Sequence, residues 1–187
     1  MSDAGGAALL RPTIDVGRPD DVEACVALWV ATVAEREGGV APDGTAERSR
    51  SKFARRPVSF VVARNGTRAA GDSRGLVGFG LVTASGTGMA ADPPDAAYLG
   101  MLGVAPRSQG RGLGARLLER LESDARKAGH AALVLHVLTS NTAAVSLYRS
   151  RGWAELGDPF PHPLTGAATQ TYELRFGYPQ PPRPEGR

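Results

Sequence analysis

The most informative segment of this 187-residue chain runs Leu102-Gly103-Val104-Ala105-Pro106-Arg107-Ser108-Gln109-Gly110-Arg111-Gly112-Leu113-Gly114-Ala115-Arg116-Leu117-Leu118. The pattern is typical of the end of a strand, a turn rich in glycine and arginine, and the start of a strong helix. The first N–H groups of a helix lack internal partners and its dipole favours negative charge there, so such a turn can hold an anion. Gly110, Gly112 and Gly114 let the backbone approach a phosphate, and Arg107 and Arg111 add positive charge. The segment therefore predicts a phosphate-binding turn.

Two other interpretations of this turn are open. It could be an ordinary glycine-rich loop between a strand and a helix. Gly110, Gly112 and Ala115 also satisfy the dinucleotide pattern G-x-G-x-x-G/A, which further requires an acidic residue at the end of the next strand for the ribose. That strand ends in Leu138-Thr139-Ser140-Asn141, without a carboxylate, and the chain is short for a dinucleotide domain plus a substrate domain. The sequence therefore disfavours NAD as the ligand.

Helices and strands alternate on both sides of this segment. The helix over 113–128 is the clearest, because its leucines and alanines form one apolar stripe and a glycine follows as a stop signal. A helix over 20–35 begins at Asp20, which can cap it with Glu23 three residues later. The strand over 131–138 is almost continuously apolar, as expected when both faces are buried. The other predicted elements are strands over 13–16, 58–63, 76–83, 96–104 and 169–176, and helices over 45–54 and 141–151. This order predicts a single mixed α/β (α+β) domain.

Length and composition narrow the class of protein. With 42% hydrophobic and 22% charged residues, the chain is typical of a globular protein of one domain. We expect this domain over 12–176, with flexible tails at 1–11 and 177–187, the second rich in proline. The net charge of +3 is too small to indicate a nucleic-acid partner, and no run of about 18 apolar residues predicts a membrane span. A single cysteine, no zinc spacing and no signal-peptide pattern lead us to expect a cytoplasmic protein without a metal.

Two motifs in the second half of the chain resemble the GNAT N-acetyltransferase superfamily. The first is Gln109-x-x-Gly112-x-Gly114, after a strand that ends Leu102-x-Val104-x-Pro106. The second is Asn141-x-x-Ala144-x-x-Leu147-Tyr148-x-x-x-Gly152-Trp153. One helix and one buried strand separate the two motifs, as in that family. The resemblance covers residues 96–153, and the earlier elements match the family only in order and length.

The resemblance implies a fold, a co-substrate and residue roles. The fold is a central mixed, mostly antiparallel sheet flanked by helices, whose fourth and fifth strands, here 96–104 and 131–138, splay apart into a slot. Acetyl-CoA would lie in that slot, and Arg116 could reach its phosphates. The implied cofactor-binding residues are Leu102, Val104, Gln109, Gly110, Arg111, Gly112, Leu113, Gly114, Ala115 and Asn141. Tyr148 is implied as the catalytic residue that protonates the departing thiolate, while the amide near Leu102 polarises the carbonyl.

The chain departs from the family pattern where the acceptor amine would lose its proton. Family members often place a carboxylate just before the L-x-V segment, and here Gly100 and Met101 occupy those positions. Glu35 and Glu37 follow the first helix, where acidic groups could attract a cationic amine. An amine of low pKa would need no base at all. The candidates for a general base are Tyr98, Asp95, Glu35 and Glu37.

Some of these residues also have purely structural interpretations. Asn141 could simply cap its helix, and Tyr148 could simply pack in the core. His136 lies in the middle of an apolar strand and is expected to be a hydrogen-bonded core histidine. The tryptophans expected to pack are Trp29 and Trp153, and the histidines expected at the surface are His130 and His162.

The resemblance therefore implies an acyl-CoA-dependent N-acyltransferase that moves acetyl to a primary amine by direct attack. The acceptor could be a small molecule or a peptide, and the protein could be a monomer or a homodimer. The alternative is a non-catalytic acyl-CoA-binding module with the same fold. The missing strand carboxylate favours this alternative, and the presence of Tyr148 argues against it.

Overall fold

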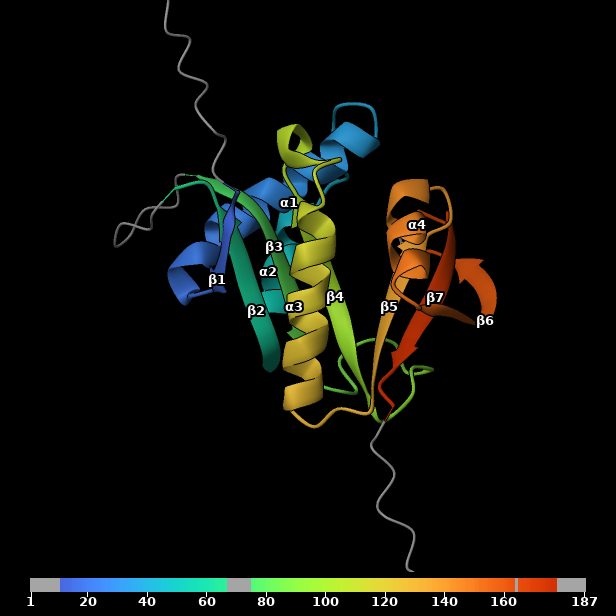
Figure 1. Ribbon diagram of the computed structural model, residues 1–187. Helices are drawn as coiled ribbons and strands as arrows, with labels where there is room; N and C mark the ends of the chain where they lie inside the picture. The colour runs from blue at the N-terminus through green and yellow to red at the C-terminus, as the bar shows by residue number, and fades with distance from the viewer. Residues whose placement is uncertain (1–10, 67–74, 164, 178–187) are drawn as a thin grey trace, which may run out of the picture.

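A sheet of seven strands runs through the computed structural model, which describes residues 11–66, 75–163 and 165–177. The strands lie in the order β1-β2-β3-β4-β5-β7-β6 (Figure 1). They are β1 (Thr13–Val16), β2 (Pro57–Arg64), β3 (Leu76–Thr83), β4 (Ala96–Val104), β5 (Ala132–Leu138), β6 (Ala154–Pro161) and β7 (Ala168–Arg175). The helices are α1 (Val22–Arg36), α2 (Thr45–Phe53), α3 (Leu113–Lys127) and α4 (Thr142–Ser150), with short 3-10 helices at Pro19–Asp21 and Pro106–Ser108. Only β4 and β5 pair in parallel, which confirms the predicted mixed, mostly antiparallel sheet.

The two parallel strands separate soon after they begin. They pair only where Ala96–Tyr98 lies beside Ala132–Val134, and further along they diverge (Figure 1). A bulge on β4 contributes to this separation. Leu81 of β3 faces Met101 and Val82 faces Leu99, so Gly100 is an extra residue of β4. The predicted splay of these two strands is therefore confirmed.

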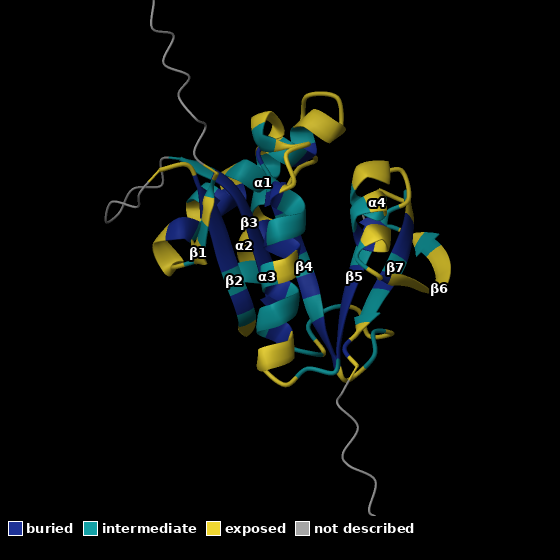
Figure 2. Ribbon diagram, viewed as in Figure 1, coloured by how far each residue is buried: buried dark blue, intermediate teal, exposed yellow. Residues whose placement is uncertain are grey.

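Helix α3 covers one face of the sheet over β2, β3 and β4. Leu117, Leu118 and Leu121 are fully buried there, as the apolar stripe predicts. Gly80 allows the helix to come close, because a Cβ at this position would lie 2.4 Å from Leu121 Cδ1. Figure 2 shows the central strands as mostly buried, with exposed residues mainly in the helices and loops.

Helices α1 and α2 cover the opposite face. Cys25 of α1 is buried in a second apolar cluster, where burial raises the pKa of its thiol, so the cysteine packs rather than reacts. The ring of Phe53, at the end of α2, lies 5.1 Å from that of Phe60 and 6.0 Å from that of Phe79. These contacts anchor α2 beside the region where β4 leaves β5.

The structure corrects two predictions of the elements. Asp21, not Asp20, occupies the position before α1, because a 3-10 turn precedes the helix. The Asp21 carboxylate makes no cap hydrogen bond to α1 and instead accepts the N–H of Arg18 at 2.9 Å, which closes the 3-10 turn. Asp21 also pairs with the buried Arg64, which explains why the acid nearest the core takes this position. Strand β6 was not predicted, because its sequence contains Gly157 and two prolines. An edge strand that pairs only with β7 tolerates such residues.

The predicted tails, 1–11 and 177–187, lie outside the described residues apart from Arg11 and Gly177. The greater part of the loop expected between the strands 58–63 and 76–83 lies outside them as well. Within the described ranges, no helix is long and apolar enough to cross a membrane.

Candidate active site

The glycine-rich turn connects the end of β4 to the start of α3. Gly110 and Gly112 adopt positive φ angles of +70° and +75°, a backbone conformation that other residues rarely adopt. Gly112 is the N-cap of α3, and neither glycine has a heavy atom within 4 Å of the position a Cβ would take. The turn from Gln109 to Gly112 is exposed, and the first amides of α3 follow it. The structure therefore places an exposed glycine turn, followed by the first amides of α3, where the sequence predicts a phosphate-binding turn.

The other residues predicted to hold the cofactor contribute in different ways. Leu113 is 3% exposed with its side chain in the core, so only its backbone amide could contact a ligand. Gln109 donates from Nε2 to the carbonyl oxygen of Val104 at 3.0 Å, which ties the turn to the end of β4. Arg116 donates to the carbonyl of Pro12 at 3.0 Å, which links the first turn of α3 to the residue before β1.

Helix α4 supplies the other wall of the site. The Asn141 side chain accepts the N–H of Ala144 at 3.3 Å, so the capping interpretation is correct, and the same residue also lines a cavity. Tyr148 is 7% exposed and lines that cavity, and its ring lies 5.6 Å from that of Trp153 and 6.4 Å from that of Tyr172. Burial, followed by the nearby Tyr98, raises the pKa of Tyr148. Its phenol therefore keeps its proton at neutral pH.

A hydrogen-bonded connection to α3 fixes the turn after α4. Glu122 accepts the indole N–H of Trp153 at 2.9 Å and the Arg151 guanidinium at 2.6 Å. Gly152, between them, adopts a φ of +84° that closes the turn. Trp153 is buried, as predicted, and its packing on Tyr148 holds the phenol in place.

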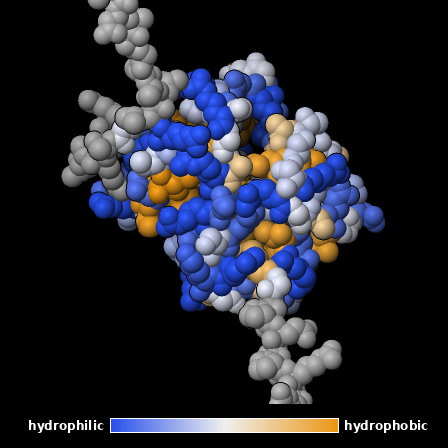
Figure 3. Space-filling model, in the orientation of Figure 1, coloured by the Kyte–Doolittle hydropathy of each residue, from blue (hydrophilic) through white to orange (hydrophobic). Residues whose placement is uncertain are grey.

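The cavity lies where β4 and β5 separate and has a volume of about 640 Å³. β4 contributes Tyr98 to Leu102, β5 contributes Leu135 to Leu138, and α4 contributes Tyr148. Helices α1 and α2 and the segment around His162 form the remaining walls. The surface is hollowed between α4 and the helices beside β4, with hydrophobic residues in and beside the hollow (Figure 3). The slot between the strands and the space below α1 and α2 are therefore one continuous site.

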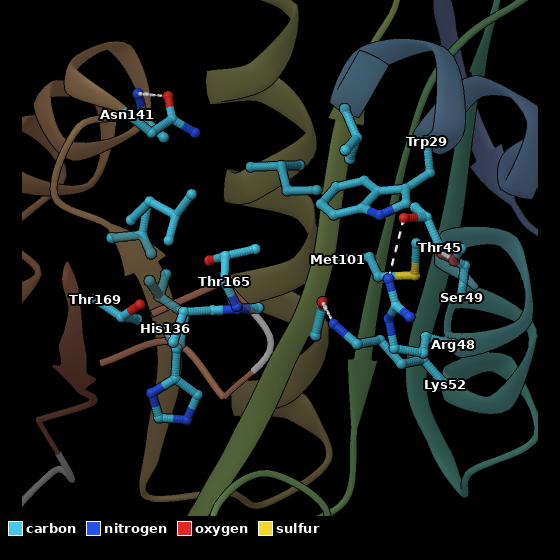
Figure 4. A pocket seen from close by; sticks show the side chains of 18 of the residues that line it. Trp29, Thr45, Arg48, Ser49, Lys52, Met101, His136, Asn141, Thr165 and Thr169 are labelled. Carbon is cyan, nitrogen blue, oxygen red and sulfur yellow. Dashed lines mark hydrogen bonds between the residues drawn. The ribbon is translucent and has the colours of Figure 1, made fainter. Parts of the chain in front are cut away.

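Basic side chains line the α2 side of this cavity (Figure 4). Lys52 donates from Nζ to the carbonyl oxygen of Gly100 at 2.8 Å and lies 5.9 Å from the centre of the Tyr98 ring. Burial, together with the charges of Arg55 and Arg48, lowers the pKa of Lys52 to about 8. Arg48, one turn earlier, points into the same space.

The predicted bases differ in where the structure places them. Tyr98 lines the cavity, and burial raises its pKa to about 12, so it is a poor base at neutral pH. Glu37 lines the cavity in an ion pair with Arg36 at 3.1 Å. Two candidates lie outside the cavity wall: Asp95 pairs with Arg175 at 3.2 Å, and Glu35 is exposed. The cavity wall therefore carries Arg36, Arg48 and Lys52, and of the predicted acids it includes only Glu37.

His136 is hydrogen-bonded as predicted, although it also lines the cavity, and His162 does not lie where it was expected. Nδ1 of His136 lies 3.0 Å from the Thr171 hydroxyl, and Nε2 lies 3.1 Å from Asp92, so both ring nitrogens are occupied. His162 is half-buried in the cavity wall rather than at the surface, and burial lowers its pKa. Trp29, expected only to pack, lines the cavity as well.

Sequence reasoning missed several residues of the site, and three of them are Arg48, Lys52 and His162. Arg48 and Lys52 stand four residues apart on a predicted helix, so their common face could have been found from spacing. No comparable pattern marks His162, which the unpredicted strand β6 brings to the cavity.

The chain is similar to known acetyltransferases. The family model of the acetyltransferase (GNAT) family matches residues 25–153. The IAA acetyltransferase of Azospirillum brasilense is 42% identical over 66 residues, 33% of this chain and 42% of that protein. The ribosomal protein bS18 alanine N-acetyltransferase of Escherichia coli is 46% identical over 61 residues, 33% of this chain and 41% of that protein. The chain thus spans less than half the length of these two relatives. The Salmonella typhimurium protein yncA, solved with its cofactor acetyl-CoA, has the same fold, with a TM-score of 0.65 over 91% of this chain and 97% of that chain at 19% identity.

Proposed function

Because this chain belongs to the acetyltransferase (GNAT) family, we propose that it transfers the acetyl group of acetyl-CoA to a primary amine. One observation carries the proposal. β4 and β5 separate beyond Tyr98 and leave a cavity that a buried tyrosine lines, beside an open glycine turn. We expect this reaction to take place in the cytoplasm.

The residues present fit acetyl-CoA as the co-substrate. The amides from Gly110 to Ala115 bind its pyrophosphate, because both Gly110 and Gly112 leave their Cβ positions open. Leu102 and Val104 pair with the pantetheine arm as an added strand would, since β5 has left that edge of β4. Arg107 and Arg111, both exposed, add positive charge beside the turn.

When bound, acetyl-CoA supplies a thioester carbonyl, and transfer forms a C–N bond to the amine as the C–S bond breaks. The amide of Leu102 donates to the carbonyl oxygen and stabilises the charge that develops there. Tyr148 gives its proton to the leaving sulfur, since its raised pKa keeps the phenol protonated until a strong base forms beside it. The amine releases its proton to water, directly or through Glu37, and Tyr148 is reprotonated from solvent.

Thermal shift and turnover test this proposal together. A ligand at 100 times its dissociation constant adds about 2.7 kcal/mol of stability, a rise of roughly 5–10 °C for a chain of this length. We expect this rise with acetyl-CoA and none with NAD. Release of the CoA thiol with a panel of small amines and peptides then measures transfer, with Tyr148→Phe as the control that binds but turns over slowly.

The outcomes separate the alternatives. A rise with acetyl-CoA together with acetylated amine supports the proposal. Binding without turnover on any amine would favour the non-catalytic acyl-CoA-binding module. If acetyl-CoA produced no shift, the glycine turn would not be a phosphate site.

A further inference from the structure

Two cationic side chains of α2, Arg48 and Lys52, line the cavity with only uncharged partners; we name them the α2 cation pair. Lys52 donates to the Gly100 carbonyl at 2.8 Å, and Arg48 donates to the Asp43 carbonyl at 2.8 Å and to the Thr45 hydroxyl at 3.1 Å. Neither cation forms an ion pair with any carboxylate in the part of the chain that the structure describes. Figure 4 shows both side chains extending from α2 toward β4.

The acids that line the same cavity do not neutralise the α2 cation pair. Glu37 is engaged with Arg36, and Asp43 is exposed and turns a backbone carbonyl toward the pair. The pKa of His162, also in the cavity wall, is lowered first by burial and then by the α2 cation pair and Arg36. Arg36, Arg48 and Lys52 therefore outnumber Glu37 and Asp43 in this part of the cavity wall.

We propose that the acceptor is an amine that also carries an anionic group, a carboxylate or a phosphonate, which the α2 cation pair binds. Amino acids are the simplest amines of this kind. The inference rests on the proposed acetyl transfer and narrows its acceptor. It opposes the expectation from Glu35 and Glu37 that the site attracts amines by negative charge.

The position of Lys52 limits the size of the acceptor. Its Nζ is held at the carbonyl of Gly100. Two residues further along β4 lies Leu102, whose amide is proposed to bind the reacting carbonyl of the thioester. Two residues of a strand rise only about 7 Å, so the Lys52 ammonium is held close to the part of β4 that carries this amide. A compact acceptor, with few bonds between its amine and its anion, spans this interval. A peptide N-terminus would place an uncharged amide beside the cations.

The α2 cation pair also offsets the absence of a carboxylate on β4. Nearby positive charge disfavours the ammonium form of an amine, as burial and neighbouring cations do for Lys52 itself. An acceptor whose anion is paired with Arg48 and Lys52 therefore loses its ammonium proton to water more readily than it would in a neutral site. A dedicated base is then less necessary.

Matched acceptors test the proposal in the full chain. We would measure kcat/KM for the common L-amino acids, the corresponding amino-acid amides, aminomethylphosphonate and an alanyl tripeptide amide, following CoA release and identifying products by mass. We expect the carboxylates or the phosphonate to exceed the matched amides by about 10- to 100-fold, the range for a charge-assisted contact. The phosphonate distinguishes the two kinds of anion.

Variants tie the preference to the α2 cation pair. Arg48→Gln and Lys52→Met should each reduce the anion preference about tenfold or more through KM, with acetyl-CoA affinity unchanged. Arg48→Lys retains a charge and should retain part of the preference. Arg56→Gln is the control, because Arg56 is an exposed cation outside the cavity wall. An unchanged acetyl-CoA thermal shift in each variant shows that the site still folds.

The results distinguish this inference from the proposed function. Equal or faster turnover of the amides or the tripeptide amide by the wild-type protein would overturn the anionic acceptor and leave acetyl transfer intact. The same holds if Arg48→Gln and Lys52→Met both kept the full preference for the anion. Absence of turnover on every acceptor, with acetyl-CoA bound, would overturn the proposed function and this inference together.

Discussion

Substitution of Gly112 by alanine separates the cost of backbone strain from the loss of cofactor binding. Gly112 adopts a φ of +75°, and its Cβ position is open, so an added methyl group strains the backbone without striking another part of the chain. Left-handed backbone costs a residue with a side chain about 1–2 kcal/mol. A midpoint decrease of roughly 2–8 °C follows for a chain of this length.

Gly129 offers a matched control on the same helix. It follows the C-terminal end of α3 with a φ of +87°, and its Cβ position is equally open. At 1.5 Å per residue it lies about 24 Å from the start of α3. Gly129→Ala should therefore destabilise the unliganded chain as much as Gly112→Ala does, without touching the phosphate cradle.

Only Gly112→Ala should weaken acetyl-CoA binding. A methyl group that displaces a phosphate from a backbone amide removes a charge-assisted hydrogen bond of about 1.5–3 kcal/mol, which raises the dissociation constant roughly 10- to 100-fold. At a concentration 100 times the wild-type constant, the stabilisation should fall from about 2.7 to about 0.4 kcal/mol for a 100-fold loss. Thermal shift with titrated acetyl-CoA measures both quantities. Equal ligand shifts in the two variants would refute the cradle.

Three further outcomes follow from the site and its supports. Tyr148→Phe should lower kcat by about 100-fold or more, with acetyl-CoA affinity unchanged in a titration, because the ring packing survives and only the acid is lost; a normal kcat would make Tyr148 a packing residue. The KM of a carboxylate acceptor should rise above about pH 8, because the lowered pKa of Lys52 means that its charge is present below this pH and lost above it; a pH series should show no such rise for Lys52→Arg. Glu122→Ala should cost about 2 kcal/mol in denaturant unfolding, because the indole N–H of Trp153 loses its acceptor, whereas Glu119→Ala on the exposed face of α3 should cost less than about 0.5 kcal/mol.

Local sequence signals predicted the half of the chain that would bind the cofactor. The apolar stripe of α3, the continuous apolar run of β5 and the turn glycines each depend on neighbours in sequence, so spacing was enough to find them. The splay of β4 and β5 came from the family resemblance rather than from spacing. The bulge at Gly100 was not predicted, because it depends on the register between β3 and β4.

The acceptor side was harder to predict because distant segments form it. Phe53 packs α2 on the sheet and so brings Lys52 to β4. Spacing within α2 indicates that Arg48 and Lys52 share a face, but it does not indicate where that face docks. His162 lies in the cavity wall because it directly follows β6, and the prolines of β6 prevented its prediction as a strand. Glu35 and Glu37 were expected to make the site negative because they follow the first helix. In the structure Glu37 is paired with Arg36, and Glu35 is exposed outside the cavity wall.

The missing carboxylate and the unexpected cations are one feature of the structure. Gly100 is the extra residue of the β4 bulge, and the carbonyl of that residue accepts the Lys52 ammonium. A Cβ at Gly100 would lie 3.2 Å from the Tyr98 ring and 3.8 Å from Lys52 Cδ, so the lysine stem and the tyrosine occupy the space beside this position. Family members often have a carboxylate at this point, which removes the amine's proton. This chain has a cation there instead, which can attract an anion. The acceptor that we propose, an amine that brings its own negative charge, fits both features.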